Sequence, residues 1–285
     1  MIPSRKVPFL TFEVSPKRKV KINLSGCNFN CKGCFAIAKQ EVGRTLSVEE
    51  LINLLIKSCQ LIYGEMVNDV QMTGGEPTMN IDYLLSLIKR LREIKVSRIG
   101  ISTNGYLLDK DVVKELGSLD VNYIKLDLKA YTEKIHRWYT GENNANVLKA
   151  ANLLNKYGLN FYVRTIFIPK VIDSSEIEKI AKFLSQINRN IPYKIYQFSP
   201  EQANSSTLRK RPTEEDMSKA FDIAEKYLDN VEFNTTATAY EPNYKYMEIR
   251  ADELLQDFER IDRISKSIIK DWNIQYFTMN QILNL

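Results

Sequence analysis

Short stretches rich in β-branched and aromatic residues alternate along the chain with longer stretches in which apolar residues recur with a helical period. The short stretches predict strands and the longer ones predict helices. We expect strands over residues 20–24, 70–73, 98–103, 123–128, 161–168 and 194–198. We expect a helix after each strand, over residues 47–63, 82–92, 109–116, 146–156, 174–186 and 212–228.

This repeated strand–helix order indicates parallel pairing and an α/β class. Right-handed crossovers would curl the units into a partial (β/α)6 TIM-like barrel, with its chemistry on loops at the carboxyl ends of the strands. We expect the barrel to occupy residues 1–230, with its core at about 20–200, and residues 231–285 to form a mostly helical C-terminal extension. Within that extension, residues 231–233 are a candidate last strand and residues 251–271 have a helical period.

Composition sets limits on the class of protein. The chain has 285 residues and is 44% apolar, enough to bury a sizeable core in one large domain or in a domain with an appendage. No apolar run is long enough to cross a membrane, and the start of the chain lacks the apolar stretch of a signal peptide. The formal net charge of +5 does not by itself indicate nucleic acid, which stays open as a partner.

Three of the four cysteines, Cys27, Cys31 and Cys34, lie on one short loop after the first predicted strand. Their C-x3-C-x2-C spacing leaves no fourth cysteine nearby. Three thiolates hold three irons of a 4Fe–4S cube and leave the fourth iron open, where a substrate can bind. The loop therefore favours one cluster with an open corner, and free cysteines of this kind predict a reducing compartment, the cytoplasm.

Other interpretations of these cysteines are weaker. A disulfide framework needs an even number of cysteines in a small secreted domain, and a structural zinc site needs four ligands. The single histidine, His136, lies far along the chain in a helix start rich in Trp and Tyr, where a structural role is favoured. Cys59 stands among apolar residues of helical period and is interpreted as a buried core residue, so the chain lacks cysteines for a second cluster.

A second motif, Thr73-Gly-Gly-Glu-Pro-Thr78, follows the second predicted strand. Its two glycines let the backbone approach a ligand closely, and Glu76 offers an acceptor to an ammonium group. Together with the cysteine loop, the motif resembles the signature of the radical S-adenosylmethionine superfamily. Residues 102–106, 124–141 and 163–169 resemble the branch of pyruvate formate-lyase (glycyl-radical enzyme) activating enzymes, and the similarity covers about residues 20–200.

The resemblance implies an enzyme that reductively cleaves S-adenosylmethionine at a 4Fe–4S cluster held by Cys27, Cys31 and Cys34. The resulting 5′-deoxyadenosyl radical takes a hydrogen atom from a substrate, and no catalytic side chain beyond the cluster ligands is implied. Contacts to S-adenosylmethionine are implied at matching positions: Gly74, Gly75 and Glu76 for the amino group, Ser102, Thr103 and Asn104 near the methionyl part, Asp127 and Lys129 for ribose and carboxylate, Arg164 on the adenine side, and Phe35 beside the third cysteine.

Some of these positions have structural alternatives. Asp127 and Lys129 point the same way on a strand and can pair with each other, and Arg164 is also a candidate ion-pair partner. The chain also departs from the family, because Gly33 stands where an aromatic residue is usual before the third cysteine. Residues 197–200 replace a histidine-bearing stretch, so the substrate-facing parts differ more than the cofactor-facing parts.

Three functions fit this pattern. Activation of a glycyl-radical enzyme, with a glycine of a protein substrate as hydrogen donor, is the one we favour. Radical modification of a small molecule or RNA is supported by the basic charge and the lost histidine-bearing stretch. A non-enzymatic iron–sulfur electron carrier is disfavoured, because a carrier needs a fully ligated cluster and no ligand pocket.

The cluster needs a one-electron donor, and small donors of the ferredoxin or flavodoxin type are often acidic. The basic residues 17–19, Lys21 and Lys32 precede or share the cysteine loop, so we interpret them as a candidate rim that steers such a donor. Residues 209–211 form another basic run, for which solvated surface is the simpler interpretation.

Overall fold

A computed structural model describes residues 3–201, 203, 207–235, 245–268 and 274–285. Its main sheet has ten strands in the order β10-β9-β8-β7-β6-β5-β3-β2-β11-β12. The six predicted strands are confirmed as β3 (Lys19–Leu24), β5 (Asp69–Gly74), β6 (Arg98–Thr103), β7 (Tyr123–Asp127), β8 (Phe161–Phe167) and β9 (Tyr193–Gln197). All six are parallel, and β10 (Val231–Asn234) continues the parallel series beside β9. The α/β partial-barrel prediction is therefore confirmed.

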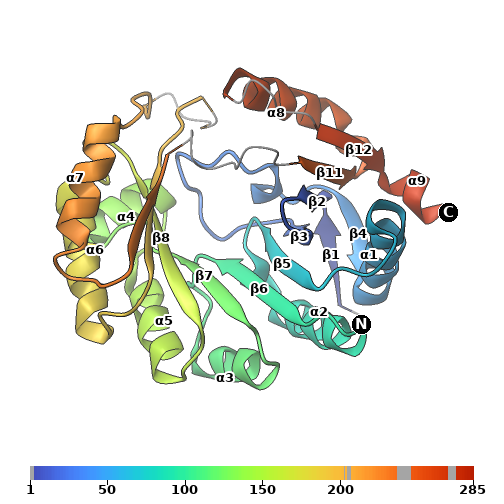
Figure 1. Cartoon of the computed structure of the whole chain (residues 1–285), viewed down its shortest axis with the longest axis horizontal. Helices are drawn as coiled ribbons and strands as arrows, with labels where there is room; N and C mark the ends of the chain where they lie inside the picture. Colours follow the sequence, from blue (N-terminus) through green and yellow to red (C-terminus); the bar gives the residue numbers. More distant parts are fainter. Residues whose placement is uncertain (1–2, 202, 204–206, 236–244, 269–273) are drawn as a thin grey trace.

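Helices cover the outer face of this curved sheet (Figure 1). The predicted ones are α1 (Val48–Tyr63), α2 (Ile81–Glu93), α3 (Lys110–Ser118), α5 (Ala145–Lys156), α6 (Ser174–Ile187) and α7 (Glu214–Ala224). Ser47 caps α1 as its sequence predicts, because the backbone N–H of Glu50 donates to its hydroxyl and its own N–H donates to the Glu50 carboxylate. Ile22, Met72 and Leu126 are fully buried in the core between sheet and helices.

Several elements were not predicted. In the N-terminal part these are β1 (Ser4–Val7), β2 (Phe9–Ser15), η1 (Ile37–Lys39), β4 (Arg44–Ser47) and η2 (Pro77–Met79), whereas the helix start expected around His136 is present as α4 (Glu133–Thr140). At the C-terminal side they are β11 (Lys245–Arg250), η3 (Asp252–Leu254), β12 (Ile274–Thr278) and α9 (Met279–Leu283). These strands are stabilised by partners that lie far away in sequence, as when β2 pairs with β11.

The C-terminal extension combines helices with strands. The predicted helix is present as α8 (Leu255–Ile268), and residues 269–271 of that prediction lie outside the described part. Strands β10, β11 and β12 belong to the same sheet as the barrel, and α9 packs on α1 (Figure 1). The boundary at residue 230 stays a prediction. Among the described residues, no helix has the length and apolarity needed to cross a membrane.

A buried arginine connects β11 to the end of the chain. Arg250 pairs with Glu248 at 2.7 Å and with Asp262 of α8 at 2.9 Å. Its guanidinium also lies 4.6 Å from the ring centroid of Phe258 and 4.5 Å from that of Tyr276. A buried charge needs such partners, so this group of contacts attaches α8 and β12 to the sheet edge.

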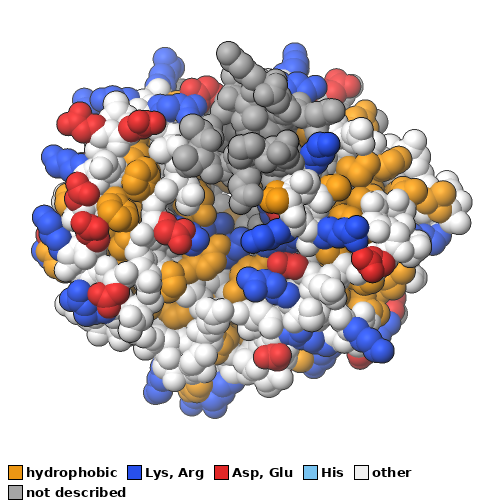
Figure 2. Space-filling model, in the orientation of Figure 1, with side chains coloured by type: hydrophobic (Ala, Val, Ile, Leu, Met, Phe, Trp, Pro, Cys, Tyr) orange, Lys and Arg blue, Asp and Glu red, His pale blue; other side chains and the backbone are white. Residues whose placement is uncertain are grey.

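The sheet face turned away from helices α1 to α7, which we call the inner face, is polar. Strand alternation sends Ile22, Met72 and Leu126 outward to the core, whereas Lys21, Gln71 and Lys125 stand on the inner face. Figure 2 shows Lys and Arg side chains gathered over the middle of the molecule, where β3, β5, β6 and β7 lie in Figure 1. The carboxyl ends of the parallel strands therefore open onto a polar interior.

Candidate functional site

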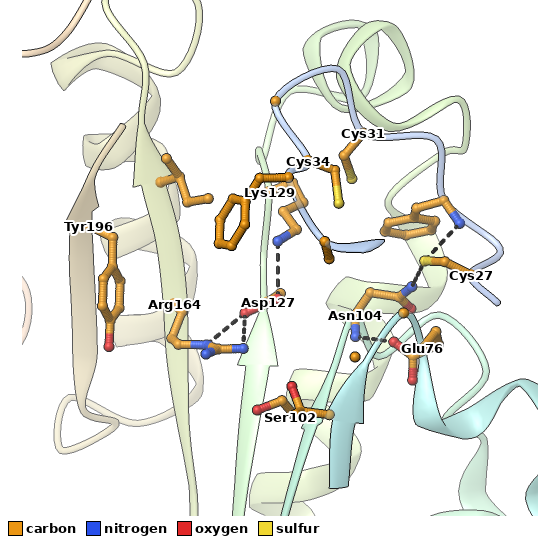
Figure 3. A pocket seen from close by; sticks show the side chains of 18 of the residues that line it. Cys27, Cys31, Cys34, Glu76, Ser102, Asn104, Asp127, Lys129, Arg164 and Tyr196 are labelled. Carbon is orange, nitrogen blue, oxygen red and sulfur yellow. Dashed lines mark hydrogen bonds and ion pairs between the residues drawn. The ribbon is translucent and has the colours of Figure 1, made fainter. Parts of the chain in front are cut away.

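A cavity of about 610 Å³ lies at the carboxyl ends of the parallel strands. Every residue expected at the site lines it: Cys27, Cys31, Cys34, Phe35, Gly74, Gly75, Glu76, Ser102, Thr103, Asn104, Asp127, Lys129 and Arg164. Figure 3 shows the cysteine loop on one side of this cavity and Asp127, Lys129 and Arg164 on another. Tertiary structure thus brings together motifs from four strand ends and the cysteine loop.

The C-terminal end of α4 holds the cysteine loop through backbone hydrogen bonds. The N–H of Asn30 donates to the carbonyl of Thr140 at 2.7 Å, and the N–H of Lys32 donates to the carbonyl of Tyr139 at 3.0 Å. The last carbonyls of a helix have no intrahelical partner, so they are free to accept these bonds. This contact gives the stretch that ends at Gly141 a structural role, because its last helical turn supports the loop that carries the cysteines.

The cysteines have the chemistry of metal ligands in a sheltered place. Burial raises the pKa of Cys27 to about 11 and that of Cys31 to about 12, although Lys129 opposes both shifts. A thiolate at such a position needs the positive charge of a metal. In the described part of the chain, no group of three His, Cys, Asp or Glu side chains converges on one ion. Three thiolates on one loop suit a 4Fe–4S cube, in which each thiolate binds a different iron, better than a structural zinc ion, which needs four ligands.

Glu76 links the loops after β5 and β6. Its carboxylate is only 1% exposed and accepts hydrogen bonds from the Thr103 hydroxyl at 2.7 Å, from the Asn104 N–H at 2.6 Å and from both donors of Thr78. Burial raises the pKa of Glu76, whereas these four donors favour its ionised form. The carboxylate expected to receive an ammonium group therefore also fixes the neighbouring loop.

Gly74 and Gly75 are required by contacts with the protein backbone. Gly74 has a φ of +113°, a conformation that favours glycine. A Cβ atom on Gly75 would overlap the carbonyl oxygens of Gly26 and Ala38. The two glycines thus let the loop after β5 lie directly against the cysteine loop.

Arg5 was missed by the sequence analysis, although it connects the same two loops. Its side chain is 7% exposed and donates to the carbonyl of Ser25 at 2.8 Å, to that of Pro77 at 2.6 Å and to that of Glu76. The residue lies in β1, far from both loops in sequence. A lone arginine near the N-terminus gives no local signal of this role.

Asp127 lies between two cations on the far side of the cavity (Figure 3). Lys129 Nζ is 3.0 Å from one carboxylate oxygen, and the Arg164 guanidinium is 2.7 Å from the other. Burial opposes ionisation, but Arg164 and Lys129 together hold the pKa of Asp127 below its usual value. The ion pairs that the sequence analysis gave as structural alternatives, Asp127 with Lys129 and Asp127 with Arg164, are therefore formed. All three side chains still line the cavity.

The space beside Gly33 is filled by aromatic side chains from elsewhere. A Cβ atom on Gly33 would approach the Tyr139 hydroxyl to 2.8 Å and the Phe198 ring to 2.9 Å. Tyr139, Phe198 and Phe35 all line the cavity, but Tyr139 and Phe198 are each 2% exposed whereas Phe35 is 59% exposed. The aromatic wall that the sequence lacks at position 33 is thus supplied by α4 and by the residue after β9.

The basic rim proposed from the sequence is not a single surface. Arg18 pairs with Glu65 at 2.6 Å, and Lys19 lies at the start of β3, at the opposite end of that strand from the cysteine loop. Lys19 Nζ donates to the Tyr123 hydroxyl at 2.7 Å. Only Lys32 of this group lies on the cysteine loop, where its ammonium is 5.2 Å from the Trp138 ring centroid.

His136 and Cys59 have structural positions. His136 is fully buried, its Nδ1 lies 2.8 Å from the carbonyl oxygen of Glu142, and its ring packs edge-on against Phe29 beside the cysteine loop. Cys59 is fully buried in α1 within the main core. Neither side chain lines the cavity.

Known proteins resemble this chain over most of its length. The family model described as the radical SAM superfamily matches residues 24–184. A protein of Methanocaldococcus jannaschii named as a glycyl-radical enzyme activating enzyme is 37% identical over 226 residues, which cover 78% of this chain and 83% of the relative.

Several solved structures share the fold. A domain of the pyruvate-formate lyase-activating enzyme from Bacteroides vulgatus matches with a TM-score of 0.51 and 21% identity, covering 58% of this chain and 98% of that domain. SuiB of Streptococcus suis, bound to its precursor peptide SuiA, matches with a TM-score of 0.60 and 16% identity, covering 89% of this chain and 55% of SuiB.

Proposed function

The chain belongs to the radical S-adenosylmethionine superfamily, and we propose that it activates a glycyl-radical enzyme by taking a hydrogen atom from a glycine of that partner. It is a radical S-adenosylmethionine enzyme whose cofactors are one 4Fe–4S cluster and S-adenosylmethionine. When bound, these cofactors supply hydrogen-atom abstraction driven by one electron. The observation that carries the proposal is one cavity lined both by the three loop cysteines and by the polar strand ends.

Cys27, Cys31 and Cys34 are the proposed cluster ligands. Hydrogen bonds from the cysteine loop to α4 fix the loop, and the N–H of Phe29 donates to the Cys27 sulfur at 3.4 Å. Hydrogen bonds to a ligand sulfur stabilise its thiolate form. The loop is therefore built to hold the three cysteine sulfur atoms in place before the cofactors arrive.

The proposed S-adenosylmethionine contacts follow from the chemistry of each side chain. Backbone at Gly74 and Gly75 meets the amino group, near the Glu76 carboxylate. Lys129 suits a carboxylate, and Asp127 suits the ribose hydroxyls. Because Asp127 already accepts bonds from Lys129 and Arg164, these cations hold its carboxylate in one orientation. Tyr139 and Phe198 give the cavity an apolar wall that excludes water.

Support for a protein substrate comes from the relatives. The relative at 37% identity is named as a glycyl-radical enzyme activating enzyme, and SuiB was solved with a peptide bound. The chain also has only four cysteines, of which Cys59 lies in the core, so it lacks ligands for a second cluster. A single-cluster enzyme with an open cavity suits a substrate segment that enters from outside.

An acidic protein of the ferredoxin or flavodoxin type is the proposed electron donor. The cysteine loop exposes Phe35, at 59%, and carries the exposed Lys32 beside Trp138, which is 45% exposed. A mixed cationic and aromatic surface next to the cysteines suits an acidic partner. This surface replaces the rim that would have included residues 17–19.

Isotope transfer tests the proposed function. The anaerobically reconstituted enzyme is given S-adenosylmethionine, a reductant and a glycyl-radical enzyme whose glycines carry α-deuterium. We expect deuterium in the released 5′-deoxyadenosine and a glycyl radical signal in the partner. Cleavage of S-adenosylmethionine with no deuterium transfer, but with transfer from a small molecule or RNA, would favour the second function instead.

A further inference from the structure

The inner face continues below the proposed S-adenosylmethionine site as a layer of polar side chains. In the strand register, Lys21 stands beside Gln71, and Ser102 stands beside Lys125, which in turn stands beside Tyr162. Lys125 also lies two residues before Asp127 on β7, on the same face. Lys21 and Ser102 line the cavity, and Lys125 stands beside Ser102 at the border of that cavity.

Positive charge exceeds negative charge on this face. We count the charged side chains of the inner face between β2 and β10 in the strand order of the sheet, together with Lys129, which follows β7. The cations are Lys19, Lys21, Arg98, Lys125, Lys129, Arg164 and Lys194. The carboxylates are those of Glu13, Asp69, Asp127 and Glu232. Each of the other cations has a carboxylate oxygen within 4.0 Å. For Lys125, the described residues offer no such partner.

Lys125 contacts aromatic rings in place of a carboxylate. Its ammonium lies 5.6 Å from the ring centroid of Tyr123 and 5.9 Å from that of Tyr162. Burial, together with the charges of Lys19, Arg164 and Lys21, lowers the pKa of Lys125 to about 6, and Glu13 opposes this shift only weakly. Among the described residues, the positive potential at Lys125 is therefore not offset by a paired carboxylate.

We propose that Lys125 and Lys21 bind an anionic group of the substrate, namely a carboxylate, at the border of the cavity that Lys21 and Ser102 line. This inference rests on the proposed function and adds a substrate class to it: the segment or molecule that donates the hydrogen atom carries an acidic group. An anion there would supply the missing counter-charge. The rings of Tyr123 and Tyr162 would flank the Lys125 ammonium that binds this anion. The same anion would leave the Asp127 pairs with Lys129 and Arg164 intact.

Binding and protonation are linked at this site. An anion raises the pKa of Lys125 above about 6, so the enzyme takes up a proton when the anion binds near pH 7. The charged groups facing Lys125 are Lys19, Lys21, Glu13 and Arg164, with the phenols of Tyr123 and Tyr162 beside it. Since the protonated lysine binds the anion better, affinity rises as the pH falls from 8 toward 6.

Amine labelling measures anion binding at Lys125 without any turnover of the enzyme. The full chain, reconstituted and loaded with S-adenosylmethionine, is treated with N-hydroxysuccinimidyl acetate at pH 7, and acetylation of Lys125 and of the exposed Lys89 is followed by mass spectrometry. Succinate and the peptide acetyl-Gly-Asp-amide should each slow acetylation of Lys125 about fivefold or more at saturation, because a protonated amine does not react. Lys89 should be unaffected. Succinamide and acetyl-Gly-Asn-amide are the neutral matched probes and should not protect.

If the acidic peptide protects Lys125 at a lower concentration than succinate does, a protein segment is the source of the carboxylate. If succinate protects at the lower concentration, the source is a small acid. Both orders support the site. Equal protection by the neutral probes, or none by either acid, would overturn it. Failure of deuterium transfer from a partner glycine would instead contradict the proposed function, since the labelling involves no reaction of the cofactors.

A variant pair completes the test. Lys125→Met removes an amine that has no carboxylate partner among the described residues and should leave the fold intact, whereas Lys89→Met is the surface control. Calorimetry on the loaded protein should show succinate affinity reduced about tenfold in Lys125→Met and unchanged in Lys89→Met, with proton uptake lost only in the former. Unchanged affinity and proton uptake in Lys125→Met would overturn the proposal.

Discussion

The Nη1 atom of Arg5 donates a hydrogen bond to the carbonyl oxygen of Pro77 at 2.6 Å, so the first strand of the chain holds the loop that follows β5. The same guanidinium donates to the carbonyl of Ser25, just before the cysteine loop. One buried side chain thus fixes the distance between the two loops. Its role is positional, because its side chain does not line the cavity.

Replacing Arg5 by Met should loosen both loops. The change leaves the carbonyls of Ser25, Glu76 and Pro77 without their donor and should lower the free energy of unfolding by about 2–4 kcal/mol. Urea unfolding measures this loss, and S-adenosylmethionine affinity should fall with it. Arg18→Met, which removes the exposed pair with Glu65, is the matched control and should cost less than about 1 kcal/mol. Equal effects of the two changes would refute the positional role.

Alanine at Cys27, Cys31 or Cys34 should abolish cofactor cleavage. The parent should bind about four irons per chain after anaerobic reconstitution, and each variant should fail to form a stable cluster. Iron analysis and release of 5′-deoxyadenosine are the measurements. Cys59→Ala is the control, and because Cys59 is buried in α1 it should lose only about 1 kcal/mol of stability and keep activity. Full activity in any of the three loop variants would rule out these ligands.

Asp127→Asn should weaken S-adenosylmethionine binding while the visible absorption of the cluster persists. Loss of hydrogen bonds from ribose to a charged acceptor is worth about 1.5–3 kcal/mol, or roughly tenfold to a hundredfold in affinity. Asp69→Asn is the matched control, because Asp69 also pairs with two cations, Lys19 and Arg98, at the opposite end of the barrel. If both variants bind the cofactor as tightly as the parent, Asp127 is only an ion-pair partner.

The Asp127 pairs also predict a pH dependence of stability. The pKa of Asp127 in the folded protein lies below its usual value near 3.9, because Arg164 and Lys129 outweigh the effect of burial. A depressed pKa contributes stability above about 3.9, and this contribution disappears as the pH falls through the folded value. The stability difference between the parent and Asp127→Asn should therefore be constant from pH 7 to about 5 and shrink below that. A difference that grows toward acid pH would contradict this assignment.

Gly75→Ala should displace the cysteine loop. The added Cβ meets the backbone carbonyls of Gly26 and Ala38, which have no flexible side chain to move away. We expect a reduced iron content and weaker S-adenosylmethionine binding together. Gly117→Ala is the control, since its new methyl meets only Leu159 at 3.7 Å and the change favours helix α3. Normal iron content in Gly75→Ala would show that the two loops need not touch.

The sequence predicted the barrel strands because each has a run of β-branched and apolar residues followed by a helix of clear period. Strands β1, β2, β11 and β12 could not be predicted in the same way, because they are stabilised by pairing that joins distant parts of the chain, as when β2 pairs with β11 and β1 with β4. The cysteines and the residues 73–78 could be placed at the site since their spacing is local. Arg5, Tyr139, Phe198 and Lys125 have no such spacing.

The sequence by itself determined the chemistry of this protein, because three thiolates on one loop specify a cluster with an open corner at any position in a fold. Tertiary structure alone decided which other side chains surround that loop. It placed two aromatic residues beside Gly33 and separated Lys19 from Lys32 along the length of β3. It also left Lys125 without a carboxylate among the described residues. The physical reason is that charge balance and packing depend on distances between strands, which the order of residues does not specify.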